Sequence, residues 1–195
     1  TDDCSTDGSS EIAFNLASSN PIIEYINGAS NSGKGQALNN AKHLIKTSHV
    51  VIHDADLEYF PDDILEMFNL VEENPESLIL GSRFIGAKDR KNVYFRTNLA
   101  NRTMSLFFSL VNFQYITDIA TCYKLMPTSF FKNLNIKEKG FSIEVEILSK
   151  FLKTNLNIIE VPIKYEGRSY TEGKKIKASD GFKYLFNTIK YRFFN

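Results

Sequence analysis

The chain has 195 residues, of which 43% are hydrophobic and 24% are charged, and these proportions exclude a disordered or fibrous protein. Its 23 basic and 23 acidic residues cancel, which excludes the global positive field that drives nonspecific nucleic-acid binding. Any anion site must therefore be local. The two cysteines, Cys4 and Cys122, are too few for a disulfide framework and form no CxxC pair, so we expect reduced thiols in a cytosolic domain.

The N-terminal residues 1–8 are acidic and turn-forming, with no strand before them and no secretory leader pattern. We therefore expect residues 1–195 to form a single domain that is truncated at its N-terminus. The longest apolar stretch, residues 104–113, is shorter than the roughly 20 residues that a membrane span needs. It is apolar nearly all round, which suits a helix packed in the core or one resting on a membrane surface or a partner.

The first half of the chain alternates helical patterns with short apolar runs. Helices are predicted over residues 11–17, 36–46 and 63–73, and strands over residues 22–26, 50–52 and 78–80. A glycine-rich turn at residues 31–35 opens the second helix, and Pro61 precedes the third.

The second half continues the alternation and ends on an amphipathic helix. Helices are predicted over residues 96–113, 141–152 and 181–193, strands over 121–125 and, as a pair around Pro162, over 158–165, and a basic loop over 174–179. Strands alternating with helices predict an α/β fold with a largely parallel sheet. Ligands of such sheets bind beyond the carboxyl ends of the strands, where the loops that start at Asp2, Asp54 and Arg83 should meet.

The sharpest local feature is a pair of carboxylates, Asp54 and Asp56, directly after a buried strand, with Glu58 two positions further on. Carboxylate oxygens are hard ligands suited to Mg²⁺ or Mn²⁺, ions that often bind a substrate diphosphate at the same time. The alternative is an acidic turn that only precedes a helix.

The turn at residues 31–35 lacks the spacing of a Walker A motif, which disfavours a P-loop NTPase. Lys34 either places a cation near a nucleotide or belongs to a plain helix-capping turn. Asp2 and Asp3 either accept hydrogen bonds from a base or ribose or only cap the helix that follows.

Several basic residues lie in predicted loops or at helix starts, where arginine's planar fork suits phosphate oxygens. They are Arg83, Arg96, Arg102, Arg168, Lys174 and Lys175. The alternative for each is an ordinary solvated charge.

Eight segments, taken together in order and spacing, resemble the family 2 glycosyltransferases of GT-A fold, in particular polyprenyl-phosphate sugar synthases such as dolichyl-phosphate mannose or glucose synthase. The segments are DDCSTDGS at Asp2, NSGKGQAL at Asn31, HDADLEYFPDDI at His53, GSRF at Gly81, an arginine then Asn101 in RTNLAN, TDIATCYKLM at Thr117, GFSIEVEIL at Gly140 and EVPIKYEGRSYTEGKKI at Glu160. The family begins with a further strand and a segment that shapes the nucleotide pocket. The resemblance therefore implies a sheet that lacks its N-terminal strand here.

The resemblance also implies a role for each matching residue. The nucleotide-side positions of the family match Asp2, Asp3, Lys34 and Asp54, and its metal-and-diphosphate motif matches Asp54, Asp56 and Glu58. The arginines that hold the acceptor phosphate match Arg83 and Arg96, and a mobile basic loop over the diphosphate matches Arg168, Lys174 and Lys175. The catalytic set implied by these matches is Asp56, Arg83 and Asp118. The third position of the metal motif is often Gln in the family. Asp118 matches an acidic position that is sometimes proposed as a base, although it would instead orient Arg83 or Arg96 if the acceptor is already anionic.

The function implied is an inverting, metal-dependent transfer of a hexose from a nucleotide sugar of the GDP-mannose or UDP-glucose type to a polyprenyl phosphate. The expected cofactor is Mg²⁺ or Mn²⁺, and the expected location is the cytoplasmic face of a membrane, held peripherally. Two alternatives stay open. One is a family 2 enzyme acting on a saccharide or protein, and the other is an inactive remnant that only binds a nucleotide or a membrane partner.

Overall fold

The computed structural model describes every residue except 87–88, 92–93, 169–177 and 195, and of residues 178–180 it describes the backbone alone. Lys174 and Lys175, and with them most of the predicted basic loop, therefore lie outside the described residues.

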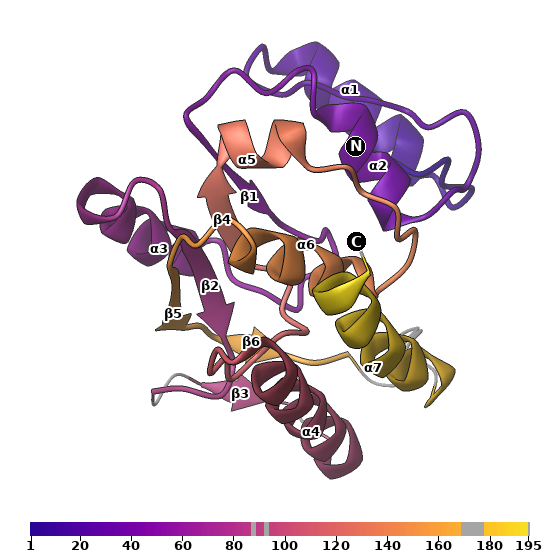
Figure 1. Ribbon diagram of the computed structural model, residues 1–195. Helices are drawn as coiled ribbons and strands as arrows, with labels where there is room; N and C mark the ends of the chain where they lie inside the picture. Colours follow the sequence, from indigo (N-terminus) through magenta and orange to yellow (C-terminus); the bar gives the residue numbers. More distant parts are fainter. Residues whose placement is uncertain (87–88, 92–93, 169–177, 195) are drawn as a thin grey trace.

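A four-stranded sheet forms the centre of the molecule. Its strands lie in the spatial order β1 (His49–Ile52), β4 (Lys124–Pro127), β2 (Leu78–Ser82) and β5 (Ile158–Pro162) (Figure 1). β2 pairs in parallel with β5, whereas β4 pairs antiparallel with both β1 and β2. Three of the four strands thus run in one direction. The predicted α/β class with a mostly parallel sheet is confirmed, and the reversed central strand β4 is a feature that the sequence did not indicate.

Seven helices surround this sheet among the described residues. They are α1 (Ser9–Ser19), α2 (Lys34–Ala41), α3 (Asp62–Glu73), α4 (Phe95–Asn112), α5 (Thr128–Asn133), α6 (Ile143–Leu152) and α7 (Ala178–Phe193). A second, two-stranded sheet pairs β3 (Arg90–Lys91) with β6 (Tyr165–Glu166) in parallel, close to the end of β2 (Figure 1).

The two faces of the central sheet pack against different helices. Side chains alternate along each strand, so neighbouring residues of one strand belong to different cores. In β2, Leu78 and Leu80 face the core that contains α6, whereas Ile79 faces the core on the side of α3. α6 is buried almost completely, and it packs against α7, which in turn packs against α4. Helices α4, α6 and α7, all from the second half of the chain, thus form one packed group.

The predicted strand over residues 22–26 is wrong. Ile22 is 89% exposed, and the segment joins residue 2 only through one isolated parallel bridge between Asp2 and Asn27. An apolar run becomes a strand only where a neighbouring strand accepts its backbone hydrogen bonds, and none of the named strands borders this segment.

Two element boundaries and one helix also differ from the sequence prediction. The helix predicted to reach residue 46 ends at Ala41, where the chain turns. The strand predicted from residue 121 begins at Lys124, because the Thr121 hydroxyl accepts a hydrogen bond from the Tyr123 backbone N–H and forms a local turn. The short helix α5 was not predicted.

The glycine-rich turn before α2 is explained by close packing against the segment before α6. Gly33 has a φ of 91°, in the region that favours glycine, and the Gly35 N–H donates to the Lys139 carbonyl oxygen at 3.1 Å. A Cβ added to Gly35 would lie 1.9 Å from the Glu138 carbonyl oxygen. Because that oxygen belongs to the backbone, it cannot turn away.

Replacing Gly35 with alanine should therefore destabilise the fold by about 1–3 kcal/mol, as overpacking does. Denaturant unfolding followed by circular dichroism measures this loss. Gly140→Ala is the matched control, since a Cβ there meets nothing within 4 Å. Equal stabilities of the two variants would contradict the packing explanation.

Candidate active site

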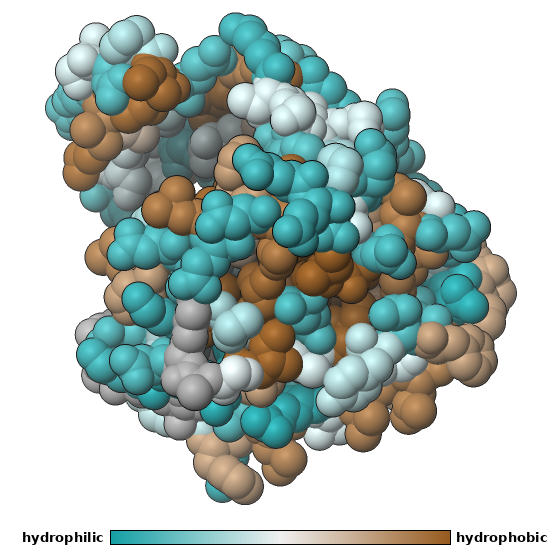
Figure 2. Space-filling view, turned by 90° about the vertical axis from the view of Figure 1, so that its left-hand side faces the viewer, coloured by the Kyte–Doolittle hydropathy of each residue, from teal (hydrophilic) through white to brown (hydrophobic). Residues whose placement is uncertain are grey.

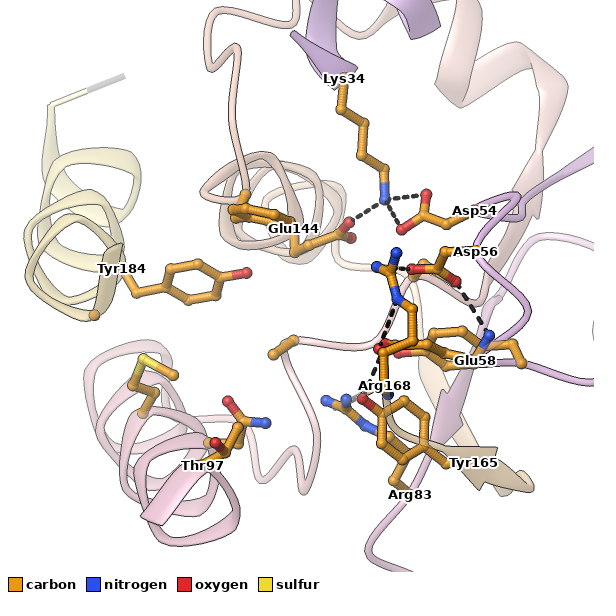
Figure 3. A pocket seen from close by; sticks show the side chains of 17 residues that line it. Lys34, Asp54, Asp56, Glu58, Arg83, Thr97, Glu144, Tyr165, Arg168 and Tyr184 are labelled. Carbon is orange, nitrogen blue, oxygen red and sulfur yellow. Dashed lines mark hydrogen bonds and ion pairs between the residues drawn. The ribbon is translucent and has the colours of Figure 1, made fainter. Parts of the chain in front are cut away.

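A cavity of about 330 Å³ lies beyond the carboxyl ends of β1 and β2 (Figure 3). Polar side chains gather on one wall: Lys34 from the start of α2, Asp54, Asp56 and Glu58 from the loop after β1, Arg83 from the loop after β2, and Tyr165 and Arg168 from β6 and the residues that follow it. Thr97 from α4 and Tyr184 from α7 lie on the other side of the cavity, and Glu144 from α6 lies beside Lys34 (Figure 3). Met104 of α4 also lines the cavity. Of the three loops predicted to meet, those that start at Asp54 and Arg83 line this cavity together, whereas the loop at Asp2 does not.

Lys34 contacts two carboxylates. Its Nζ lies 2.7 Å from Asp54 Oδ1 and 2.8 Å from Glu144 Oε1. Burial alone would lower the pKa of Lys34, but the two carboxylates outweigh burial and raise it above its ordinary value. Lys34 is therefore a fully charged ammonium that neutralises Asp54, the first acid of the predicted metal pair.

Glu144 extends this contact into the core. Its second carboxylate oxygen lies 2.5 Å from the Nζ of Lys124, a lysine with no exposed surface. Burial acts to raise the pKa of Glu144, but Lys124 and Lys34 together lower it below its ordinary value. Asp54, Lys34, Glu144 and Lys124 form a row of alternating charges, which we call the charge row.

Arg168 contacts the other two acidic residues of the loop. Its Nη2 lies 2.9 Å from Asp56 Oδ2, and its Nε lies 3.3 Å from Glu58 Oε1. Glu58 also accepts hydrogen bonds from the Arg168 backbone N–H at 3.0 Å and from the Tyr165 hydroxyl at 2.9 Å. Arg168 thus joins Asp56 to Glu58, and Figure 3 shows its side chain across the pocket wall.

The acidic loop fits a divalent cation only in part. Burial is the main cause that raises the pKa of Asp56; the charges of Glu58 and Asp54 add to this effect, whereas Arg168 acts against it. Over the described residues, however, no three His, Cys, Asp or Glu side chains are grouped so that they could hold a metal ion by themselves. Mg²⁺ usually binds one or two protein carboxylates and takes its other ligands from phosphates and water. Asp54 and Asp56 meet that requirement.

Arg83 is fixed by Asp118 in a buried, two-pronged ion pair. The Asp118 carboxylate has no exposed surface and accepts from Arg83 Nε and Nη2, each at 2.7 Å, and from the Arg83 backbone N–H at 3.0 Å. This is the orienting arrangement considered above as the alternative to a base. Asp118 itself does not line the cavity.

Asp2 and Asp3 both accept hydrogen bonds from other residues of the chain. Asp3 accepts from the backbone N–H groups of Ser32 and Gly33, at 2.7 and 2.6 Å, and so fixes the turn before α2. The hydroxyl groups of Ser10 and Ser5 are the main causes that lower the pKa of Asp2. The alternative that these two acids cap the helix that follows is wrong, because α1 has no side-chain cap hydrogen bond.

A second, open groove of about 1050 Å³ meets the first cavity at Lys34, Asp54 and Asp56. Its remaining lining comes from Asp3, the segment before residue 27, α2 and β1. Figure 2, which shows the side of the molecule that is on the left in Figure 1, presents a mixed hydrophilic and hydrophobic surface that is hollowed near its upper edge.

Arg96 is not in the cavity that contains Arg83. It lines a shallow apolar groove of about 450 Å³ between α4 and α7, together with Leu99, Ala100, Thr103, Met104, Gly181, Phe182 and Leu185. Met104 and Gly181 line both spaces, so the groove and the cavity are neighbours. The two arginines predicted as one phosphate site thus lie in adjoining but different spaces.

Two residues that form ion pairs or hydrogen bonds with the predicted site residues were missed by the sequence analysis. Glu144 and Tyr165 lie within quoted segments, yet neither was singled out. Glu144 carried a readable signal, because an acid between Ile143 and Val145 on a buried helix needs a partner. Tyr165 carried none, since an aromatic residue at the end of a strand is ordinary.

Comparisons with known proteins agree with this geometry. A family model described as glycosyl transferase family 2 matches residues 1–134. A UDP-N-acetylglucosamine–dolichyl-phosphate N-acetylglucosaminyltransferase of Methanococcus voltae is 28% identical over 141 residues, which cover 71% of this chain and 56% of the relative. An undecaprenyl-phosphate mannosyltransferase of Micrococcus luteus is 22% identical over 179 residues, which cover 89% of this chain and 73% of the relative.

Solved structures show the same fold at low identity. Glucosyl-3-phosphoglycerate synthase from Mycobacterium tuberculosis superposes with a TM-score of 0.65 at 15% identity, covering 97% of this chain and 66% of that structure. A second mycobacterial protein gives a TM-score of 0.61 at 14% identity, covering 96% and 61%. This chain spans about half to three quarters of the lengths of these proteins.

Proposed function

The chain belongs to glycosyl transferase family 2, and from that premise we propose that its cavity transfers a hexose from a nucleotide sugar to a polyprenyl phosphate. The observation that carries the proposal is the meeting of the acidic pair Asp54 and Asp56 with the cations Arg83 and Arg168 in one cavity. Such a site can bind two phosphate-bearing substrates side by side, because the cations attract the phosphates and the acids can share a divalent cation with them.

The donor is assigned to the open groove that meets the cavity at Lys34, Asp54 and Asp56. Its size suits a nucleoside, and its junction with the cavity would place the diphosphate beside the acidic pair. Asp54 and Asp56 are the residues proposed to hold Mg²⁺ or Mn²⁺, and a cation bound there would offset the negative charge that develops on the leaving diphosphate. Arg168, with Lys174 and Lys175, is proposed to contribute further positive charge.

The acceptor is assigned to the side of the cavity that contains Arg83. The names of the two relatives from Methanococcus voltae and Micrococcus luteus include a polyprenyl phosphate, and the apolar groove between α4 and α7 adjoins the cavity there. The acceptor phosphate would then lie beside the Arg83 cation, and its apolar polyprenyl chain would lie in the apolar groove. Arg96, which also lines the groove, would then attract the phosphate as it enters rather than hold it during reaction.

Membrane association is proposed from the exposed apolar residues of α4 and α7. Phe95 is 78% exposed and Phe113 85% exposed on or beside α4, and Phe182 is 76% exposed on α7. Aromatic side chains exposed on adjoining helices suit the boundary of a lipid layer. Within the described chain, no helix combines the length and apolar character that crossing a membrane requires. From the exposed aromatic residues we propose a peripheral contact, on the cytoplasmic face of the membrane.

The chemistry follows from the acceptor. A phosphate monoester is anionic at neutral pH, so its oxygen can attack the anomeric carbon without a strong base, and one direct displacement inverts that centre. Asp118 has both oxygens engaged with Arg83, which suits an orienting role better than proton abstraction. We therefore place Asp118 among the positioning residues.

The test is transfer of label from radiolabelled UDP-N-acetylglucosamine, UDP-glucose and GDP-mannose to undecaprenyl phosphate in detergent with Mn²⁺. Label is expected in the organic phase with at least one donor, and none is expected with undecaprenol, which lacks the phosphate. Label in a saccharide or protein acceptor instead would favour the rival family 2 activity. Binding of UDP or GDP without transfer to any acceptor would favour an inactive remnant.

A further inference from the structure

Glu58 was assigned to the metal motif by resemblance, but its contacts in the structure are of another kind. Its two carboxylate oxygens accept from different groups: Oε2 from the Tyr165 hydroxyl, and Oε1 from the backbone N–H and Nε of Arg168. The Glu58 backbone carbonyl accepts from the Glu166 N–H at 2.9 Å. The side chain is only 13% exposed. Both oxygens are thus engaged in holding the segment from Tyr165 to Arg168.

Arg168 in turn lies against the acid that a divalent cation would need. Its Nη2 is 2.9 Å from Asp56 Oδ2, while Asp56 Oδ1 accepts from the Glu58 backbone N–H at 3.2 Å. Lys34 likewise forms an ion pair with Asp54. Asp56 is therefore paired with a guanidinium and Asp54 with an ammonium, both from the chain itself, and a divalent cation that binds Asp56 Oδ2 has to displace the guanidinium.

We propose that Glu58, with Tyr165, is a positioning residue that holds Arg168 across Asp56, and that Arg168 and a divalent cation compete for Asp56. When the cation binds, the guanidinium leaves Asp56 while the Arg168 main chain stays anchored on Glu58. The freed guanidinium then lies next to the incoming diphosphate. This inference rests on the proposed function, because the competing cation is the one proposed there.

The test is Mn²⁺ binding to the nucleotide-free protein, measured by calorimetry after treatment with a chelator. Arg168→Gln should raise the Mn²⁺ affinity about three- to fivefold, because it removes a partly exposed ion pair that the metal must break. Glu58→Gln should change the affinity less than about twofold once Arg168 is already Gln, since its effect acts through Arg168. Lys132→Gln, which removes an exposed cation on α5, is the matched control and should leave the affinity unchanged.

Two results would overturn the proposal. One is a Glu58→Gln loss of about tenfold or more in both backgrounds, which is the behaviour of a metal ligand. The other is an Arg168→Gln affinity equal to or below that of the wild type, which includes the case in which neither protein binds Mn²⁺. Thermal unfolding of each variant in chelator checks that it is folded. Sugar transfer by the same wild-type preparation decides the proposed function separately.

Discussion

Replacing Glu144 with alanine should lower the free energy of unfolding by about 3–5 kcal/mol, the cost of removing one partner from a buried ion pair. Glu144 is 4% exposed and is the anion between two cations, Lys34 and Lys124. Its loss leaves the fully buried ammonium of Lys124 with only the Thr121 carbonyl oxygen as a hydrogen-bond partner among the described contacts. Urea unfolding at neutral pH measures the effect.

The control is Glu72→Ala, an exposed acid on α3, which should change the stability by less than about 0.5 kcal/mol. Glu144→Gln should fall between the two, because the amide keeps one acceptor oxygen but loses the charge. A loss below about 1 kcal/mol for Glu144→Ala would show that the charge row contributes little to the fold.

The pH dependence of this contribution has a definite sign. The folded-state pKa of Glu144 is lowered from its ordinary value of 4.5, so its contribution is fully present above about pH 4.5. That contribution is lost as the pH falls through the lower folded-state pKa. The stability difference between the wild type and Glu144→Ala should therefore narrow on acidification below pH 4.5.

The second large effect is expected at Arg83. Arg83→Lys should slow transfer to polyprenyl phosphate by about 10²-fold or more, because a lysine cannot supply both donors to Asp118 and still meet a phosphate. Binding of the nucleotide sugar should be retained, since Arg83 does not line the groove assigned to the donor. Initial rates at saturating donor, with the acceptor concentration varied, measure the loss.

Arg96→Lys is the matched comparison for Arg83→Lys, because Arg96 lies in the adjoining groove outside the cavity. Its effect should be confined to the apparent affinity for the acceptor and should be much smaller. Equal losses in turnover at the two positions would mean that both arginines hold the reacting phosphate. The separation of the two sites proposed above would then be wrong.

Much of this arrangement is readable from local sequence patterns. The strand that ends before Asp54 and the helix that begins at Asp62 follow from a β-branched run and from the acids after Pro61. The convergence of the loops after β1 and β2 follows from the rule that ligands bind at the carboxyl ends of parallel strands. These features depend on residues close in sequence, which is why a single chain suffices to predict them.

The contacts that define the site depend on residues far apart in the chain. Nothing near Lys34 indicates that its partner is Glu144, which is 110 positions away, and Glu58 meets Arg168 across the same separation. The failed strand at residues 22–26 has the same origin, because a strand requires a partner that local pattern does not supply. The sequence pattern thus predicts local helices and strands, but it does not predict which distant residues or strands contact one another.

The most direct measurement of the central claim is anomalous diffraction from a crystal grown with Mn²⁺ and a nucleoside diphosphate. The account predicts one manganese peak beside Asp54 and Asp56, with the diphosphate next to it and the base in the open groove. An empty cavity, or a nucleotide bound away from these two acids, would contradict it.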